Sequence, residues 1–179
     1  MSKLPSRLHH TAYVSKDLEA TRVFYEDVLG IPLVATWCET DFLFGKDRTY
    51  CHLFFGLGDG SALAFFQFAD AQDQALFGPE LPASPFRHIA LNVDKETQAE
   101  LEARIARADL QGSYVLEHGY CRSVYVEDPD GMIVEFTCDD PRAAAGDAER
   151  RGKAHAELKR WLAGDHTSNN LFRHEEEAA

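Results

Sequence analysis

Residues 8–30, LHHTAYVSKDLEATRVFYEDVLG, carry the local pattern that decides the fold. The run up to Val14 is β-prone and predicts a strand. Asp17 comes next and is a candidate helix N-cap, because its carboxylate can accept an N–H from the first turn. Apolar side chains then recur with helical spacing as far as Gly30, a residue that readily adopts the left-handed conformation ending a helix. The stretch therefore predicts a strand followed by a helix.

Three apolar, β-prone segments follow, at 31–38, 49–57 and 61–68. Gly58-Asp59-Gly60 separates the last two and is typical of a hairpin turn. Beyond a loop at 69–85, rich in Pro, Asp and Gln, the same order recurs. The second set consists of a strand at 86–93, an amphipathic helix at 95–110, and strands at 112–117, 121–127 and 132–138, with the turn Asp128-Pro129-Asp130-Gly131 before the last strand.

The order β-α-β-β-β thus occurs twice, with a period of roughly 75 residues. His10 and His88 begin equivalent strands, and Gly60 and Gly131 end equivalent turns. We expect an α+β fold in which two βαβββ modules form a cupped, mostly antiparallel sheet. The first module is expected at about 6–70 and the second at about 86–138, within one domain at 6–138, followed by a helical or partly disordered tail at 139–179.

Charge and composition exclude several classes of function. The formal net charge of −12 argues against binding to nucleic acid or to anionic membranes. No stretch approaches the roughly 20 apolar residues that span a bilayer, and the N-terminal MSKLPSRLHH lacks the apolar segment of a secretory signal. The four cysteines form no C-x-x-C pair, which favours reduced, mostly buried thiols. We expect a cytoplasmic protein that acts on a small molecule.

The alternation of side chains along a strand places two histidines and a carboxylate on one concave surface. His88 lies on the face opposite Ile89, Leu91 and Val93, which is the better face to pack against a helix. Glu135 lies in a strongly apolar strand, where an unpaired carboxylate is costly. His10, His88 and Glu135 therefore predict a site for one divalent metal ion. Two imidazoles and one carboxylate leave coordination positions open, which suits non-heme Fe(II).

Other interpretations of these residues stay open. Each histidine could be an ordinary sheet residue, and Glu135 could pair with an arginine; the matched places in the repeat favour metal binding instead. His9 is the rival of His10 as a ligand. Glu135 lies four residues after Gly131, and the same offset from Gly60 reaches Ala64. Since alanine cannot ligate a metal, the fourth corner of the site is expected to be open to water, substrate or dioxygen.

These motifs resemble the vicinal-oxygen-chelate superfamily, which includes glyoxalase I, extradiol dioxygenases, methylmalonyl-CoA epimerase and the fosfomycin and bleomycin resistance proteins. The resemblance covers about residues 6–138 and rests on HTAYVSKDLEATRVFYEDVLG from His10, FRHIALNV from Phe86 and VYVEDPDGMIVE from Val124. It implies a glyoxalase-like, metal-binding fold. The four-ligand pattern of glyoxalase I and the epimerase includes a carboxylate in the first module, and Ala64 departs from that pattern.

Part of the second module is similar to the extradiol dioxygenase signature. The matching positions are His118, Val124, Tyr125, Asp128, Pro129, Gly131 and Glu135, whereas Leu116 departs from the small or β-branched residue expected there. The resemblance implies an oxidoreductase in which the three ligands hold iron as Fe(II), with a catecholic substrate and O₂ as reactants. Tyr125 would donate a hydrogen bond to substrate, and His118 would act as acid or base. An ordinary half-buried aromatic and a loop histidine are the alternatives.

His52 is expected to line the same cup, on the strand equivalent to that of Ser123 and Tyr125. It is a candidate base or substrate contact, and the alternative is a buried residue bonded to backbone. The same ligands also bind Mn, Zn or Ni, so a glyoxalase-like lyase, an isomerase or a thiol transferase is the runner-up, followed by a non-enzymatic resistance protein. The tail and the open cup suggest a homodimer.

Overall fold

The computed structural model describes residues 5–78 and 84–172. The first module contains β1 (Tyr13–Val14), α1 (Leu18–Arg22), a π-helical segment (Val23–Val28), β2 (Leu33–Leu43), β3 (Lys46–Gly56), β4 (Ala62–Phe68) and α2 (Ala71–Phe77). The second module contains β5 (His88–Asn92), α3 (Lys95–Arg107), β6 (Tyr114–Glu117), β7 (Cys121–Glu127) and β8 (Ile133–Asp139). A 3-10 turn (Ala143–Gly146) and the helix α4 (Asp147–Leu162) follow.

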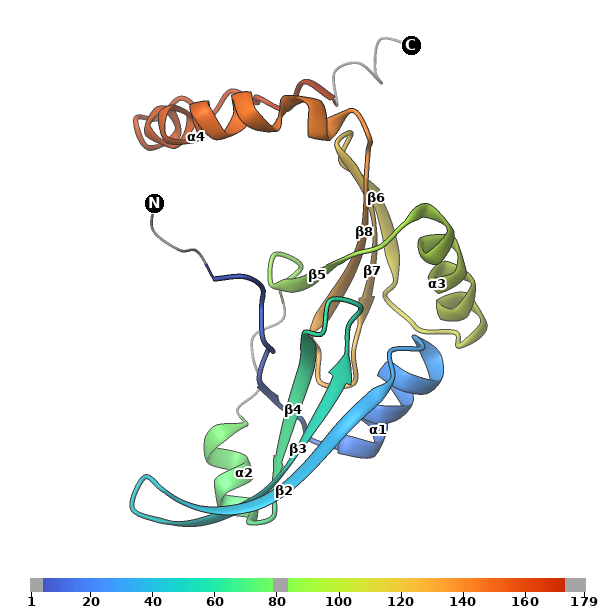
Figure 1. The fold of residues 1–179 in the computed structure, drawn as a ribbon, viewed down its shortest axis with the longest axis vertical. Coiled ribbons are helices and arrows are strands. Elements are labelled where there is room, and N and C mark those ends of the chain that lie inside the picture. The colour runs from blue at the N-terminus through green and yellow to red at the C-terminus, as the bar shows by residue number, and fades with distance from the viewer. Residues whose placement is uncertain (1–4, 79–83, 173–179) are drawn as a thin grey trace.

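The two modules have the same topology (Figure 1). Each forms a four-stranded sheet within the described residues, in the orders β1-β4-β3-β2 and β5-β8-β7-β6. The first strand of each module runs parallel to the last one, and the other neighbours are antiparallel. The predicted α+β fold of two βαβββ modules with a helical tail is therefore confirmed.

The strand register confirms the internal repeat at the level of single residues. His10 forms a bridge with Ala62, and His88 pairs with Ile133. Two residues further along the last strand of each module lie Ala64 and Glu135, which are therefore equivalent positions. Their neighbours across the adjacent strand are Phe54 and Tyr125, respectively.

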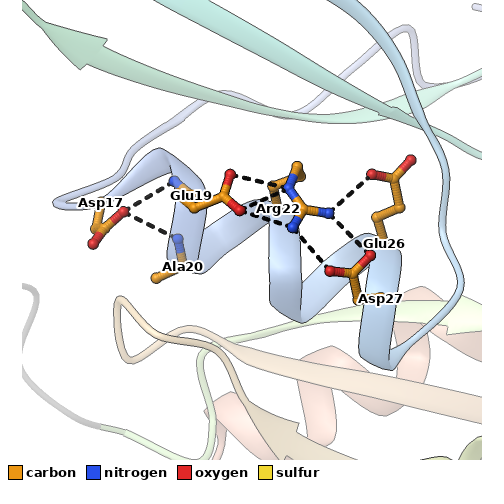
Figure 2. Close-up of polar contacts among 6 residues, drawn as sticks. All are labelled: Asp17, Glu19, Ala20, Arg22, Glu26 and Asp27. Atoms are coloured by element: carbon orange, nitrogen blue, oxygen red, sulfur yellow. Dashed lines mark hydrogen bonds and ion pairs between the residues drawn. The ribbon is translucent and has the colours of Figure 1, made fainter.

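Figure 2 shows how the sequence begins and holds the first helix. The Asp17 carboxylate accepts hydrogen bonds from the backbone N–H groups of Glu19 and Ala20, at 2.9 and 3.0 Å. Arg22 lies at the junction with the π-helical segment, and its guanidinium bonds Glu19, Glu26 and Asp27. Glu26 also accepts the N–H of Leu33 at 3.1 Å, so the network ties the helix to the start of β2. The predicted cap is confirmed.

The helices α1 and α3 lie on the same side of the two sheets, and α4 projects away from them (Figure 1). One apolar core joins both modules and includes Tyr25, Phe65, Leu101 and Phe136. Tyr25 is fully buried and donates a hydrogen bond to Asp128, in the β7–β8 turn, at 2.9 Å. Burial of this core on the helical side leaves the other face of each sheet available for a site.

Several local expectations were wrong. The first strand is confined to Tyr13–Val14 with an isolated bridge at His10, and the hairpin of β2 and β3 is longer than predicted. The expected loop at 69–85 contains α2, because Asp70 caps it by accepting the N–H groups of Gln72 and Asp73. Residues 79–83 of that loop and 173–179 of the tail lie outside the described residues.

The cysteines and the helices bear on two further expectations. All four cysteines are free, but the expectation that they are mostly buried was wrong, since Cys121 is buried, Cys51 and Cys138 are half-buried and Cys38 is exposed on β2. Within 5–78 and 84–172, no helix is both long and apolar enough to cross a membrane.

Candidate metal centre

The second module brings two of the three predicted metal ligands together. His88 Nε2 lies 2.9 Å from Glu135 Oε2, and Glu135 is only 6% exposed. His88 Nδ1 lies 3.1 Å from the carbonyl oxygen of Pro85, which can only accept, so Nδ1 carries a proton. In the neutral imidazole Nε2 is then an acceptor that faces a carboxylate oxygen. The pair therefore requires a proton or a cation between the two atoms, and a metal ion fits this donor set.

Glu135 is held from its other side by a tyrosine and a histidine. The Tyr125 hydroxyl donates to Glu135 Oε1 at 3.0 Å, and His118 Nε2 lies 3.0 Å from the same hydroxyl. Because the tyrosine proton is directed to the carboxylate, His118 Nε2–H is the donor to Tyr125. One hydrogen-bonded chain thus runs from His118 through Tyr125 to Glu135, and the other oxygen of Glu135 faces His88.

Tyr125 is buried, and Tyr114 stacks on it with ring centroids 4.7 Å apart. Burial, followed by the hydrogen bond to Glu135, raises the pKa of Tyr125 to about 12. The phenol is therefore protonated at neutral pH and can serve as a donor. Tyr114 was not identified from the sequence as a site residue, because its cross-strand pairing with Tyr125 depends on a register that the sequence does not reveal.

The first module contains the remaining predicted residues. His10 Nδ1 lies 2.7 Å from His9 Nδ1, and the His10 ring is 5.9 Å from that of His52 and 5.4 Å from that of Phe54. His52 stacks on Phe66 with centroids 3.5 Å apart. The two histidines therefore share one aromatic surface of the first module.

His52 is only 8% exposed, and its Nε2 is buried without a hydrogen-bond partner in the part of the chain that the structure describes. The alternative of a histidine bonded to backbone through this atom is therefore not what the structure shows. Burial, and secondarily the nearby His10, lowers the pKa of His52 to about 4. The imidazole is neutral at physiological pH and has a ring nitrogen available for a ligand.

The three predicted ligands do not meet within one chain. Among the described residues, no three His, Cys, Asp or Glu side chains are grouped so that they could hold a metal ion. His88 and Glu135 form one part of a site in the second module, and His10 lies in the first module with His52. What remains is a prediction that these two parts bind the same ion.

The surfaces around the two parts are open. His88, Ala90 and Asn92 are exposed along β5, while Ile89 and Leu91 pack toward the core, as the alternation predicted. Phe86 is 93% exposed and Trp37 is 58% exposed. A pocket of about 290 Å³ beside His10 is lined by His9, Trp37, Phe54, Gly56 and Ala62, among others. An apolar ligand group or a second protein surface would fit against this region.

Tyr125→Phe tests the hydrogen-bonded chain. The substitution leaves a buried carboxylate oxygen without its donor, so we expect a loss of about 1–3 kcal/mol in the free energy of unfolding of chelator-treated protein. The pKa of Tyr125 lies above the ordinary value of 10.0, so folding favours the protonated phenol. Wild-type stability should therefore fall as pH rises from about 10 to 12, and this component should vanish in the variant. Urea denaturation at several pH values measures the free energy of unfolding and its pH dependence. If wild type and Tyr125→Phe had the same stability and the same change with pH, the hydrogen bond from Tyr125 to Glu135 would be refuted.

The fold defines a class of proteins built from two βαβββ modules, and comparison with known sequences agrees. The profile of the glyoxalase/bleomycin resistance protein/dioxygenase superfamily matches residues 7–136, and the chain belongs to this superfamily. An uncharacterized protein of Bacillus subtilis, YwbC, is 32% identical over 145 residues, which is 74% of this chain and 98% of that protein.

Two solved structures share the fold at low sequence identity. A mutant of the fosfomycin resistance protein FosX from Listeria monocytogenes, complexed with Mn(II) and 1S,2S-dihydroxypropylphosphonic acid, matches with a TM-score of 0.56 and 20% identity, over 79% of this chain and 99% of that one. FosX from Mesorhizobium loti matches with a TM-score of 0.53 and 20% identity, over 80% and 99%. At this identity the likeness supports the fold alone.

Proposed function

We propose that this protein is a metal-dependent enzyme whose site is completed by two copies of the chain, with His88 and Glu135 from one copy and His10 from the other. The observation that carries the proposal is the contact of His88 Nε2 with Glu135 Oε2 at 2.9 Å. In the neutral imidazole, with Nδ1 of His88 donating to Pro85, both atoms are acceptors, and a bound cation would satisfy the pair as a proton would.

The internal repeat supports the two-copy arrangement. Closed twofold dimers bring the same surface of both copies together. If the first module of each copy faces the second module of the other, both His10 residues meet a His88–Glu135 pair, and two equivalent sites form. The side chains of His88 and Trp37 are exposed and would lie in the contact surface between the two copies.

The ligand set indicates which metal the site would prefer. Two imidazoles and one carboxylate suit Fe(II) chemistry, and they also accept Mn, Zn or Ni. Ala64 stands where the second module has Glu135, so a fourth protein ligand is not supplied from the equivalent position. FosX, which shares the fold, is a protein complexed with Mn(II), and this supports a divalent ion here.

The reaction we favour is extradiol cleavage of a catecholic substrate, in which both atoms of O₂ enter the ring-opened product. A bound divalent ion would supply Lewis-acid stabilisation of two neighbouring substrate oxygens and, as Fe(II), electrons for dioxygen. Tyr125 and His118 would hold and move the substrate proton, because they form one hydrogen-bonded pair at 3.0 Å. His52 Nε2 would bond a polar substrate group, and Phe54 and Phe66 would flank a flat ring.

Oxygen uptake separates this reaction from the lyase, isomerase or transferase reactions of the same superfamily. Protein purified anaerobically and loaded with Fe(II), Mn(II), Zn(II) or Ni(II) would be mixed with a panel of substituted catechols under air or under ¹⁸O₂. We expect Fe(II)-dependent oxygen consumption and two ¹⁸O atoms per product molecule. Turnover of any substrate with another metal and without oxygen uptake would contradict the dioxygenase reaction while leaving the metal site intact.

A further inference from the structure

The chain beyond the superfamily domain folds back on itself. After α4 the backbone turns at Gly164, whose φ is +91°, and residues 165–172, here called the tail segment, return along the helix. Asn169 Nδ2 donates to Glu157 Oε2 at 3.0 Å, and Arg160 Nη2 donates to the carbonyl of Thr167 at 2.8 Å. The tail segment therefore runs antiparallel to α4 and ends near the base of that helix.

The base of α4 lies above the end of the β6–β7 hairpin (Figure 1). There Asn170 Nδ2 donates to the backbone carbonyl of His118 at 2.9 Å, across 52 residues of sequence. The same turn is closed by the His118 N–H bonding the Cys121 carbonyl, and it is tied to the end of β8 by the Asp140 N–H bonding the Tyr120 carbonyl, both at 2.9 Å. The tail segment thus contacts the turn that carries His118.

The contact connects the tail to the candidate site. His118 begins the hydrogen-bonded chain that passes through Tyr125 to Glu135. Asn170 bonds the backbone carbonyl of His118 itself. A movement of that carbonyl therefore also moves the His118 imidazole and changes the position of its Nε2 relative to Tyr125. The superfamily profile ends at residue 136, and the segment that makes this contact lies outside it.

We propose that the tail segment positions His118, with Asn170 as the residue that makes the contact. Asn170 is a positioning residue, because it acts on the site through the backbone of His118 and lies beyond the hydrogen-bonded chain itself. Asn170 Oδ1 is buried without a hydrogen-bond partner among the residues described, so its donor is the atom that anchors the side chain. The functional meaning of this contact rests on the proposed function, whereas the contact itself can be tested without a substrate.

Two isosteric variants of the full chain test the proposal. Asn170→Asp replaces the donor with an oxygen that repels the His118 carbonyl, and Asn169→Asp does the same toward Glu157 without touching the turn. Amide hydrogen exchange of residues 118–121, and the ¹⁵N signals of the His118 imidazole, report on the turn and on its side chain. We expect exchange to rise roughly 3- to 10-fold in Asn170→Asp, about the equilibrium factor of one hydrogen bond, and the His118 signals to shift.

The control Asn169→Asp should leave both readouts at their wild-type values. Equal changes in the two variants, or unchanged His118 signals in Asn170→Asp, would overturn the positioning role. Binding of Mn²⁺ is measured on the same samples and should be unaltered by either substitution. A wild-type protein that binds no Mn²⁺ and no other divalent ion would defeat the proposed function, and the exchange results would still decide the role of Asn170.

Discussion

His88→Ala is expected to abolish stoichiometric metal binding. The substitution removes one donor and leaves the buried Glu135 carboxylate with Tyr125 as its remaining partner at the site. Loss of an outer partner of a metal ligand costs about 10- to 100-fold in affinity, and loss of the ligand itself should cost more. Glu135→Gln keeps the shape of the side chain but removes its charge, so it should weaken binding comparably.

The measurement is elemental analysis of anaerobically purified protein together with titration of the apoprotein with Mn²⁺. His155→Ala provides the control, since His155 is an exposed histidine on α4 and belongs to none of the proposed ligands. We expect His155→Ala to retain the metal and His10→Ala to lose it. His9→Ala removes the 2.7 Å contact to His10 Nδ1 and should weaken binding by about 10- to 100-fold without abolishing it. Circular dichroism checks that each variant is folded. A His88→Ala protein that keeps stoichiometric metal would refute the assigned site.

Much of the fold could be predicted because it depends on local chemistry. The Asp17 cap requires a carboxylate just before a helix, and Gly30 does have a positive φ of 79° at the end of that helix. The alternation along 88–92 correctly separated the residues that pack on the core from the exposed ones. The repeat could be recognised in the sequence because both modules have the same fold and therefore place similar residues at equivalent positions.

The rest depends on contacts between segments far apart in the sequence. The helix α2 follows from the cap formed by Asp70, inside a stretch whose composition indicated a loop. The stacking of Tyr114 on Tyr125 follows from strand register, and the contact of Asn170 with His118 follows from the path of the tail. A single site formed by His10, His88 and Glu135 stays a prediction, because these side chains come from both modules and the described residues do not group them as ligands of one ion.

A mixed dimer should recover the metal that both single variants lose. In the proposed arrangement one site contains His10 of the first copy with His88 of the second, and the other site contains the reverse pair. When one copy carries His10→Ala and the other His88→Ala, both substitutions fall in one site, and the other site is built entirely from wild-type ligands. A site made within one chain would be damaged in both copies.

The mixed dimer is obtained by co-expressing the two variants with different affinity tags and purifying on both tags in turn. Each homogeneous variant should bind little metal, because each of its sites lacks one ligand. Mn²⁺ bound per dimer is then counted by elemental analysis, with the doubly tagged wild-type dimer as reference. The account predicts close to one ion per mixed dimer, about half of the wild-type amount. A mixed dimer that binds as little metal as the two homogeneous variants would contradict a site shared between two copies.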